Sequence, residues 1–199
     1  MIGIVDYGAG NLNSVRKAFH YLDKKTRIIQ YPKDVDGIRK IVLPGVGSFG
    51  AAKKKIRNSG IFPILEEWLE SNRPFLGICL GLQLLFDSSK EAPGVPGFGI
   101  FQGKCRKLEG KKVPHIGWNS VSVQKKDPVF EGIPDREFFY FVHSYHALPE
   151  DDEIILGRTD YGIEFSSAVR RENIYAVQFH PEKSGKAGLL FLKNWVMSC

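Results

Sequence analysis

The stretch Phe75-Leu76-Gly77-Ile78-Cys79-Leu80-Gly81 is an apolar run with glycines on both sides of its cysteine. Such a run is typical of a buried strand, and the residues from Leu80 to Ser88 carry the pattern of a helix. We therefore predict a sharp turn at Cys79, where Gly77 and Gly81 leave space that side chains would fill. The following helix N-terminus would favour a thiolate. A lone cysteine is more often a buried structural residue, but the flanking glycines favour a nucleophile.

The chain before this run alternates between strand patterns and helix patterns. Residues Ile2 to Asp6 form a short apolar strand, and apolar residues then recur at helical spacing from Leu12 to Leu22, with Asn11 or Asn13 available as the N-cap. We expect further strands at Arg27–Gln30 and Lys40–Leu43, and an amphipathic helix at Ile61–Leu69. This order predicts an α/β fold, with an open, mostly parallel sheet and helices on both faces.

The second half of the chain has a different pattern. The segment from Glu91 to Gly103 is rich in Gly and Pro, which predicts a loop. A closing helix is expected at Gly185–Met197. Between them lie short strand-like runs, at Ser120–Val123, Phe138–Val142, Ile154–Gly157, Phe165–Val169 and Tyr175–Phe179. We therefore expect extra short antiparallel strands in this half.

The composition is that of an ordinary globular protein, which we expect to form a single domain over residues 1–199. Three cysteines, an odd number without paired spacing, indicate neither a disulfide framework nor a zinc site. No window approaches the roughly 20 apolar residues of a membrane span, and the N-terminus lacks a signal-peptide pattern. We therefore expect a cytoplasmic protein that binds no metal and no membrane.

The net charge of +6 is spread over short basic clusters such as Lys53-Lys54-Lys55 and Lys125-Lys126. Most such clusters are solvated faces, although they could meet an acidic partner or an anionic substrate. Because no basic stretch is interleaved with aromatic residues, nucleic-acid binding is not expected.

A second apolar strand, Tyr175 to Phe179, leads directly into His180-Pro181-Glu182. In an extended chain, residues two apart point the same way, so Glu182 can hold the imidazole of His180 and stabilise its protonated form. Considered alone, a histidine at a strand end is more often a surface residue. Together with Cys79, the His-x-Glu pair predicts a nucleophilic hydrolase that forms a thioester.

One loop fits the glycine pattern of a dinucleotide-binding site, namely Gly45-Val46-Gly47-Ser48-Phe49-Gly50. The acidic residue that would confirm this function should end the next strand, but that strand ends on Cys79. We therefore expect the loop to lie near Cys79 and its amides to supply an oxyanion donor, in addition to the amide of Leu80.

The chain resembles the class I (triad) glutamine amidotransferases in two segments, Gly77-Ile78-Cys79-Leu80-Gly81-Leu82-Gln83 and His180-Pro181-Glu182. Three further stretches are similar to the glutaminase subunits of imidazole glycerol phosphate synthases, in histidine biosynthesis. They are Asp6-Tyr7-Gly8-Ala9-Gly10-Asn11-Leu12, Pro114-His115-Ile116-Gly117-Trp118-Asn119 and Phe141-Val142-His143-Ser144-Tyr145. The resemblance covers essentially the whole chain and implies a flavodoxin-like fold and a reaction without a cofactor.

The resemblance also implies roles for individual residues. Cys79, His180 and Glu182 would form the triad that hydrolyses L-glutamine to glutamate and ammonia through a glutamyl thioester. Backbone amides of Leu80 and of the Val46–Gly47 segment would form the oxyanion hole. The residues implied in holding glutamine are Gly45, Gln83, His143, Ser144 and Tyr145.

The resemblance further implies a partner, a (β/α)₈-barrel synthase subunit that forms a heterodimer with this chain. It would receive the ammonia and form imidazole glycerol phosphate and an aminoimidazole carboxamide ribotide. Trp118 would be an anchor of the kind that dominates interfaces, although a core position is nearly as consistent with the sequence. In the family the Pro44–Gly47 loop must rearrange, so we expect poor glutamine hydrolysis without the partner. The candidate docking residues are Asn11, Asn13, Pro114, His115, Trp118 and Asn119.

Three rival functions share some of these features. The glutaminase subunit of anthranilate or aminodeoxychorismate synthase would share the triad, but not the stretches around Asp6 and Pro114. A cysteine peptidase could use the same triad on a peptide. A nucleotide-binding module would instead use Gly45 to Gly50 as a phosphate cradle.

Overall fold

The computed structural model describes residues 1–8, 10–109 and 112–199. Ala9, Gly110 and Lys111 lie outside the described residues. The Asp6-to-Leu12 stretch is therefore described except at Ala9.

One half of the sheet is parallel, and it contains the strands that the alternating pattern predicts. Its strands lie in the order β2-β1-β3-β4-β12, and each neighbouring pair is parallel. Four of these strands are apolar and almost wholly buried, as expected for a sheet covered on both faces. The bounds are β1 (Ile2–Val5), β2 (Thr26–Ile29), β3 (Lys40–Gly45), β4 (Phe75–Cys79) and β12 (Ile174–Val177).

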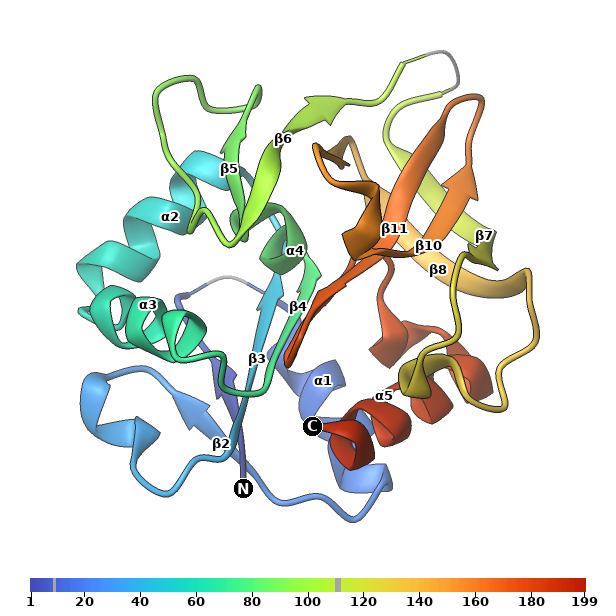
Figure 1. Ribbon diagram of the computed structural model, residues 1–199. Helices are drawn as coiled ribbons and strands as arrows, with labels where there is room; N and C mark the ends of the chain where they lie inside the picture. The colour runs from blue at the N-terminus through green and yellow to red at the C-terminus, as the bar shows by residue number, and fades with distance from the viewer. Residues whose placement is uncertain (9, 110–111) are drawn as a thin grey trace.

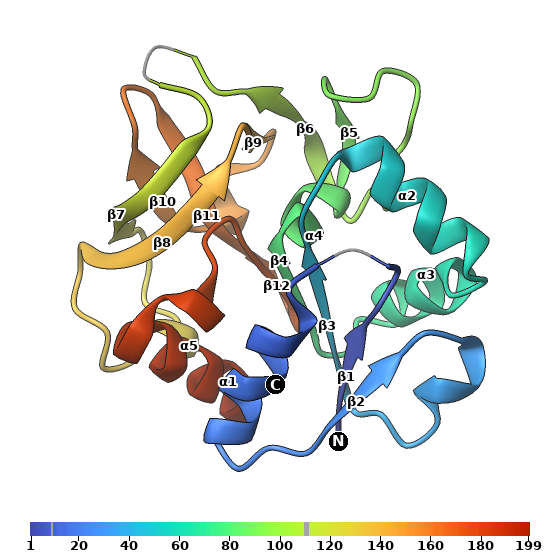
Figure 2. The same cartoon turned by 180° about the vertical axis from the view of Figure 1, so that it is seen from behind.

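Helices cover both faces of this parallel half (Figures 1 and 2). Helices α2 (Phe49–Asn58) and α3 (Phe62–Glu70) pack on one face, where Phe49, Trp68 and their neighbours form one buried core. Helices α1 (Leu12–Tyr21) and α5 (Gly185–Ser198) pack on the other. The predicted α/β fold is confirmed. Among the described residues, no helix combines the length and the apolar character needed to cross a membrane.

The other half of the sheet is antiparallel and larger than the short strands predicted from the sequence. It continues from β12 in the order β11-β10-β7-β8. Three more strands form a small layer, in which β5 and β6 form a parallel pair, whereas β9 is antiparallel to both β6 and β11. The bounds are β5 (Phe86–Ser89), β6 (Phe101–Lys107), β7 (His115–Val123), β8 (Glu137–His143), β9 (Tyr145–Pro149), β10 (Ile155–Asp160) and β11 (Glu164–Arg171). Short 3₁₀ turns lie at Pro32–Val35 (η1), Pro128–Phe130 (η2), Asp152–Ile154 (η3) and Pro181–Lys183 (η4).

Two sequence predictions around Cys79 are wrong in their bounds. The helix predicted for Leu80 to Ser88 ends early, as α4 (Leu80–Leu84), and β5 follows it. The predicted loop from Glu91 to Gly103 gives way to β6 at Phe101. Tertiary pairing explains both, because the Leu85 carbonyl accepts hydrogen bonds from the amides of Ile100 and Phe101 instead of continuing the helix.

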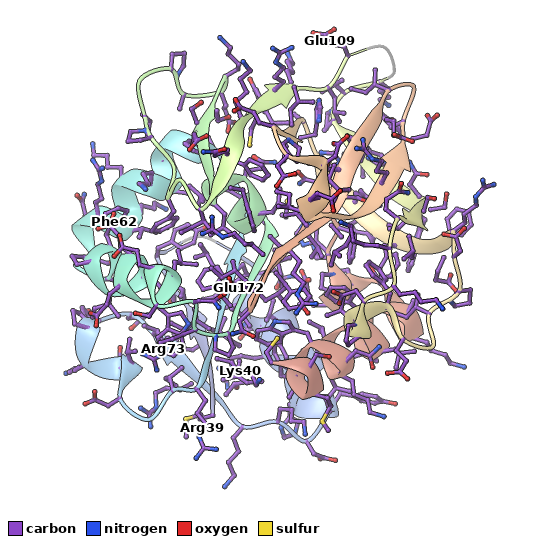
Figure 3. All side chains as sticks on the ribbon, viewed as in Figure 1. Arg39, Lys40, Phe62, Arg73, Glu109 and Glu172 are labelled. Carbon is purple, nitrogen blue, oxygen red and sulfur yellow. The ribbon has the colours of Figure 1, made fainter. Side chains whose placement is uncertain are left out.

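The register of β4 against β12 is fixed where the two strands begin. The amide N–H of Asn173 donates to Asn72 Oδ1 at 3.1 Å, and the Phe75 amide donates to the Asn173 carbonyl at 3.1 Å. Figure 3 labels Arg73 and Glu172, which flank this clamp on its two segments. The register then pairs Ile78 with Val177 at the far end, so Cys79 and the residues after Val177 leave the sheet side by side.

Candidate active site

Cys79 occupies a strained turn between β4 and α4. Its backbone has φ 56° and ψ −107°, a conformation that a side chain-bearing residue rarely adopts and that costs on the order of 1–3 kcal/mol. Glycines on both sides make the turn possible. A Cβ on Gly81 would lie 1.9 Å from the Leu43 carbonyl oxygen, and a Cβ on Gly77 would lie 2.8 Å from the Gly81 backbone. The predicted turn is confirmed, and it holds the thiol at the carboxyl edge of the sheet.

His180 and Glu182 follow the neighbouring strand β12 and reach the same edge. Both side chains are 2% exposed, and His180 Nδ1 lies 2.8 Å from Glu182 Oε1. The alternative placement of His180 on the surface, which the sequence already disfavoured, is therefore excluded. Because a carboxylate accepts hydrogen bonds only, Nδ1 carries the proton and Nε2 is left for chemistry.

The electrostatics of His180 connect it to Cys79. Burial disfavours the imidazolium, but the Cys79 thiolate and the Glu182 carboxylate outweigh burial and raise the pKa of His180 to about 10. His180 Nε2 is itself buried and makes no hydrogen bond to the described residues. The ring is thus poised to exchange a proton with a group placed between it and the thiol.

Two buried glutamines surround the thiol. Gln178 Nε2 lies 3.6 Å from Cys79 Sγ, and Gln178 Oε1 accepts a hydrogen bond of 3.2 Å from Gln83 Nε2. Gln83 Nε2 also donates to the Tyr145 carbonyl at 2.9 Å. Since both amide hydrogens of Gln83 are used in this way, its Oε1 is left as an acceptor.

A cavity of about 230 Å³ opens beside Cys79. Its size suits a small molecule rather than a folded chain segment. A wider and more open hollow of about 500 Å³ lies against η2, but it is lined by neither Cys nor His. Chemistry therefore favours the smaller cavity, which is lined by Val46, Gly47, Cys79, Leu80, Gln83, Glu91, Pro114, Val142, His143, Ser144 and Tyr145.

The loop after β3 lies next to the turn, as predicted. Gly45 pairs with Cys79 across the β3–β4 ladder, and a Cβ there would lie 2.7 Å from both the Leu80 Cβ and the Tyr7 hydroxyl. Burial, Cys79 and Asp6 raise the pKa of Tyr7, while the Val46 amide acts in the opposite sense. Val46 and Gly47 line the cavity, and Leu80 begins α4 and has an N–H that the helix leaves without an acceptor.

His143, Ser144 and Tyr145 close the cavity from the β8–β9 corner. Ser144 and Tyr145 are half-buried, and His143 is 6% exposed. Burial lowers the pKa of His143 to about 3, so its imidazole is neutral at physiological pH. These three residues and Gln83 are thus brought together around one space.

Most of the predicted docking residues lie on the surface, but they are divided between two regions. Asn11 caps α1 and is exposed, as is Asn13, whereas Trp118 lies on the outer face of the β7–β8 ribbon with 55% of its surface exposed. The alternative prediction, that Trp118 lies in the core, is therefore wrong. On the same outer face Ile116 is 60% and Phe138 54% exposed, which makes an apolar patch.

Three further docking predictions need separate treatment. Pro114 is exposed and also lines the cavity, and Asn119 is half-buried. His115 is only 2% exposed, so the prediction that it lies on the docking surface is wrong. Alternate residues of a strand face opposite sides, and the exposed neighbours Pro114 and Ile116 place His115 inside.

Two residues of the site were missed by the sequence reasoning. Glu91 lines the cavity, and its Oε2 accepts a hydrogen bond of 2.7 Å from the Phe49 amide at the start of α2. Nothing in its Gly- and Pro-rich surroundings marked it out. Gln178 had a signal, because a buried polar residue directly before Phe179-His180 needs a partner.

Within the part of the chain that the structure describes, no group of three or more His, Cys, Asp or Glu side chains could hold a metal ion. Cys79, Cys105 and Cys199 are all free thiols. Burial and, to a smaller extent, the negative charge of Glu91 raise the pKa of Cys105, which leaves that thiol unreactive.

Comparison with known proteins agrees with this geometry. The family model described as "Glutamine amidotransferase class-I" matches residues 3–199. A solved structure titled "Crystal structure of glutamine amidotransferase" superposes with a TM-score of 0.78 at 18% identity and covers 98% of each chain. The structure of PurLQS from Thermotoga maritima gives the same TM-score, at 18% identity over 98% of this chain and 97% of that one. These two likenesses establish the fold.

Sequence relatives are more specific. Imidazole glycerol phosphate synthase subunit HisH of Thermococcus kodakarensis is 50% identical over 98% of each chain. The subunit HisH of Pyrococcus furiosus is 51% identical over 98% of this chain and 97% of its own length. The chain therefore belongs to the class-I glutamine amidotransferase family and, within it, to the HisH subunits of imidazole glycerol phosphate synthase.

Proposed function

We propose that this chain is the glutaminase subunit of a cytoplasmic imidazole glycerol phosphate synthase, with Cys79, His180 and Glu182 as its catalytic triad. The observation that carries the proposal is the thiol on a strained turn beside an imidazole that Glu182 holds at 2.8 Å. A nucleophile, a base and an orienting acid next to a cavity are the parts of a covalent hydrolase.

In the first half of the reaction, the Cys79 thiolate attacks the side-chain amide carbon of glutamine. The oxyanion that forms is held by the Leu80 amide and by an amide of the Val46–Gly47 segment. The His180 imidazolium gives its Nε2 proton to the leaving nitrogen, so that ammonia departs and a glutamyl thioester remains.

In the second half, neutral His180 takes a proton from water as the oxygen attacks the thioester carbon. The carbon–sulfur bond breaks, glutamate leaves, and the thiolate and imidazolium are restored. Glu182 stabilises the imidazolium in both halves without taking up the proton.

The cavity would select glutamine through the two charged groups on its α-carbon. Glu91 brings a carboxylate to the cavity wall, suited to the α-ammonium group, and Gln83 Oε1 adds an acceptor. Backbone amides around His143, Ser144 and Tyr145 would receive the α-carboxylate. Gly45, which has no side chain, lets β3 pack closely against Leu80 and Tyr7 beside the cavity.

The ammonia would pass to a (β/α)₈-barrel synthase subunit in a heterodimer that involves neither nucleic acid nor membrane. Docking would use Trp118 and its exposed neighbours on the β7–β8 ribbon, together with Asn11, Asn13, Pro114 and Asn119. Exposed aromatic side chains ringed by polar groups are typical of such contacts.

The test is the replacement Cys79→Ala in the complex with the synthase partner. We expect the loss of glutamine-dependent synthesis, while synthesis from added ammonia continues at the wild-type rate. Loss of both would assign the cysteine a structural role and contradict the proposal. The control Cys105→Ala removes the other fully buried thiol and should leave both reactions intact, provided that the variant folds.

The alternative of a different class I amidotransferase is not favoured, because the relatives at about 50% identity are HisH subunits. A peptidase is opposed by the 230 Å³ cavity, which suits a free amino acid better than an extended peptide.

A further inference from the structure

We propose that His115 is a positioning residue for glutamine binding, acting through His143 on the carbonyl group that holds Gln83. The inference rests on the proposed function, since it assumes that the cavity beside Cys79 binds glutamine. It assigns His115 a role inside the fold, in place of the docking role expected from the sequence.

A continuous line of hydrogen bonds leads from His115 to Gln83. His115 Nδ1 lies 3.0 Å from His143 Nε2, and His143 Nδ1 lies 2.9 Å from the Tyr145 carbonyl oxygen. The same carbonyl oxygen accepts the 2.9 Å bond from Gln83 Nε2. One oxygen is therefore shared by the histidine relay and by a residue of the cavity wall.

The direction of each bond follows from the chemistry of the carbonyl. A carbonyl oxygen can only accept, so His143 Nδ1 carries a proton. Because His143 is neutral, its Nε2 carries none and must accept from His115 Nδ1–H. The relay thus has one allowed arrangement, and His115 is its donor.

The outer end of the relay lies on β7. Asn119 Nδ2 is 3.5 Å from His115 Nε2 and 2.8 Å from the Asp160 carbonyl, while Asn119 Oδ1 accepts a 2.8 Å bond from the Ser120 amide. These last two contacts fix the amide so that its nitrogen faces His115. The relay is anchored at both ends by groups that cannot exchange donor and acceptor.

Packing holds the His115 ring in place, but it does not explain why the ring is an imidazole, with two nitrogen atoms. The ring stacks on Tyr161, with centroids 3.9 Å apart and planes 21° apart, and on Phe141 at 4.9 Å and 18°. A phenylalanine would stack equally well. The choice of an imidazole at a site 2% exposed therefore points to the hydrogen bond, since a buried polar atom is costly unless it is paired.

The consequence for glutamine lies in the orientation of Gln83. Its amide is held by two acceptors, the Tyr145 carbonyl and Gln178 Oε1 at 3.2 Å. If His143 turns, the Tyr145 carbonyl loses a hydrogen bond that fixes its position, so one of the two acceptors that orient Gln83 can shift. Gln83 Oε1 would then no longer be held for the substrate.

Two substitutions separate the hydrogen bond from the packing. His115→Phe keeps a stacking ring and removes the donor, whereas His115→Asn loses the ring and retains an N–H near the position of Nδ1. Steady-state glutamine hydrolysis is measured for both in the complex with the synthase partner. For His115→Phe we expect KM for glutamine to rise at least about fivefold with kcat within twofold, and for His115→Asn a KM closer to that of the wild type.

An unchanged KM in His115→Phe, or a larger rise in His115→Asn than in His115→Phe, would overturn the inference. A second measurement needs no variant: the imidazole ¹⁵N spectrum should show His143 protonated at Nδ1 only, and the opposite tautomer would also overturn it. The variant Cys79→Ala in the same assay keeps the two proposals apart. If it still hydrolyses glutamine, the proposed function fails; if it does not and His115→Phe binds normally, only the role of His115 fails.

Discussion

At the scale of single residues, the site depends on a buried thiol group beside a buried imidazole. Cys79 is 5% and His180 2% exposed, so water hydrates neither side chain well. An imidazolium is tolerated there because Cys79 lies nearby and because Glu182 holds the ring from its far side. His180 therefore already carries the proton that the first half of the proposed reaction needs.

This pairing predicts the titration of His180. The Cys79 thiolate helps to raise the pKa of His180 to about 10, so the ring should remain protonated at pH 7 and lose its proton only in the alkaline range. In Cys79→Ala the thiolate is absent, and the pKa of His180 should fall. Imidazole NMR signals followed against pH measure both values. A wild-type His180 that titrates near the ordinary 6.5 would contradict the expectation.

At the level of residues, the sequence predicted a contact correctly where the spacing between two residues fixes the direction of their side chains. The pair His180 and Glu182 lies two apart in an extended segment, and their contact follows directly. Glu91 and the relay from His115 depend on strands and loops that meet only in the folded chain, and no local spacing encodes them. His115 was assigned to the wrong side of β7 because one exposed stretch was treated as a unit.

At the scale of elements, the turn between β4 and α4 is the most constrained part of the molecule. The Cβ of an alanine at position 81 would lie 1.9 Å from a carbonyl oxygen of β3, so strand and helix must move apart to accept it. We expect Gly81→Ala to lower the free energy of unfolding by about 3 kcal/mol. Urea unfolding at constant m-value measures the change.

A matched control is Gly94→Ala. Gly94 is exposed, has φ +79°, and offers open space to a Cβ, so the substitution tests conformational strain alone. Its cost should be near 1 kcal/mol. Equal costs at the two positions would mean that the close approach at Gly81 is relieved easily.

The outer face of the β7–β8 ribbon allows a second prediction at the scale of elements. Trp118 is 55% exposed and touches Tyr140 with ring centroids 6.2 Å apart, so it contributes little to the fold. Trp118→Ala should weaken binding to the synthase partner by roughly 30-fold, the loss typical of an interface anchor. Calorimetry or light scattering of the mixed subunits measures this, with a melting temperature within a few degrees of wild type as the folding control.

Tyr21→Ala provides the matched surface substitution. Tyr21 is 74% exposed at the end of α1, which points to the edge of the sheet away from Cys79. Binding should be unchanged. If both variants bind as the wild type does, docking takes place elsewhere.

The errors in the predicted bounds of helices and strands have a common cause. Helix α4 and strand β5 share one apolar segment, and periodicity alone cannot divide it. The division comes from β6, which pairs Phe101 with Phe86. Strands β5, β6 and β9 form through pairing with one another. Because this pairing is tertiary, none of the three can be recognised from its own residues.

At the scale of the whole molecule, the sheet brings together segments that lie far apart in the sequence. The parallel half could be predicted, since alternating strands and helices allow few other arrangements. The strand order could not. It puts β12 beside β4, and this one pairing carries His180 to Cys79.

The molecule without its partner should hydrolyse glutamine slowly. We expect the Pro44–Gly47 loop to rearrange before one of its amides can serve as the second oxyanion donor. We expect turnover by the isolated chain to be at least about tenfold below that of the complex with ligand-loaded synthase. Release of ammonia, coupled to a glutamate dehydrogenase assay, measures both rates. Fast turnover by the chain alone would contradict this view of the loop.

The glycines of the turn also bear on how such proteins diverge. Gly77 and Gly81 are required by the close contact between backbones, and nothing in that contact involves the thiol. A descendant gene that lost its cysteine would keep the same two glycines for as long as it kept the fold. Glycine spacing is thus a mark of the fold, while the identity of residue 79 shows whether the nucleophile is present. Genome surveys that score only the glycine pattern will therefore count inactive copies among the enzymes.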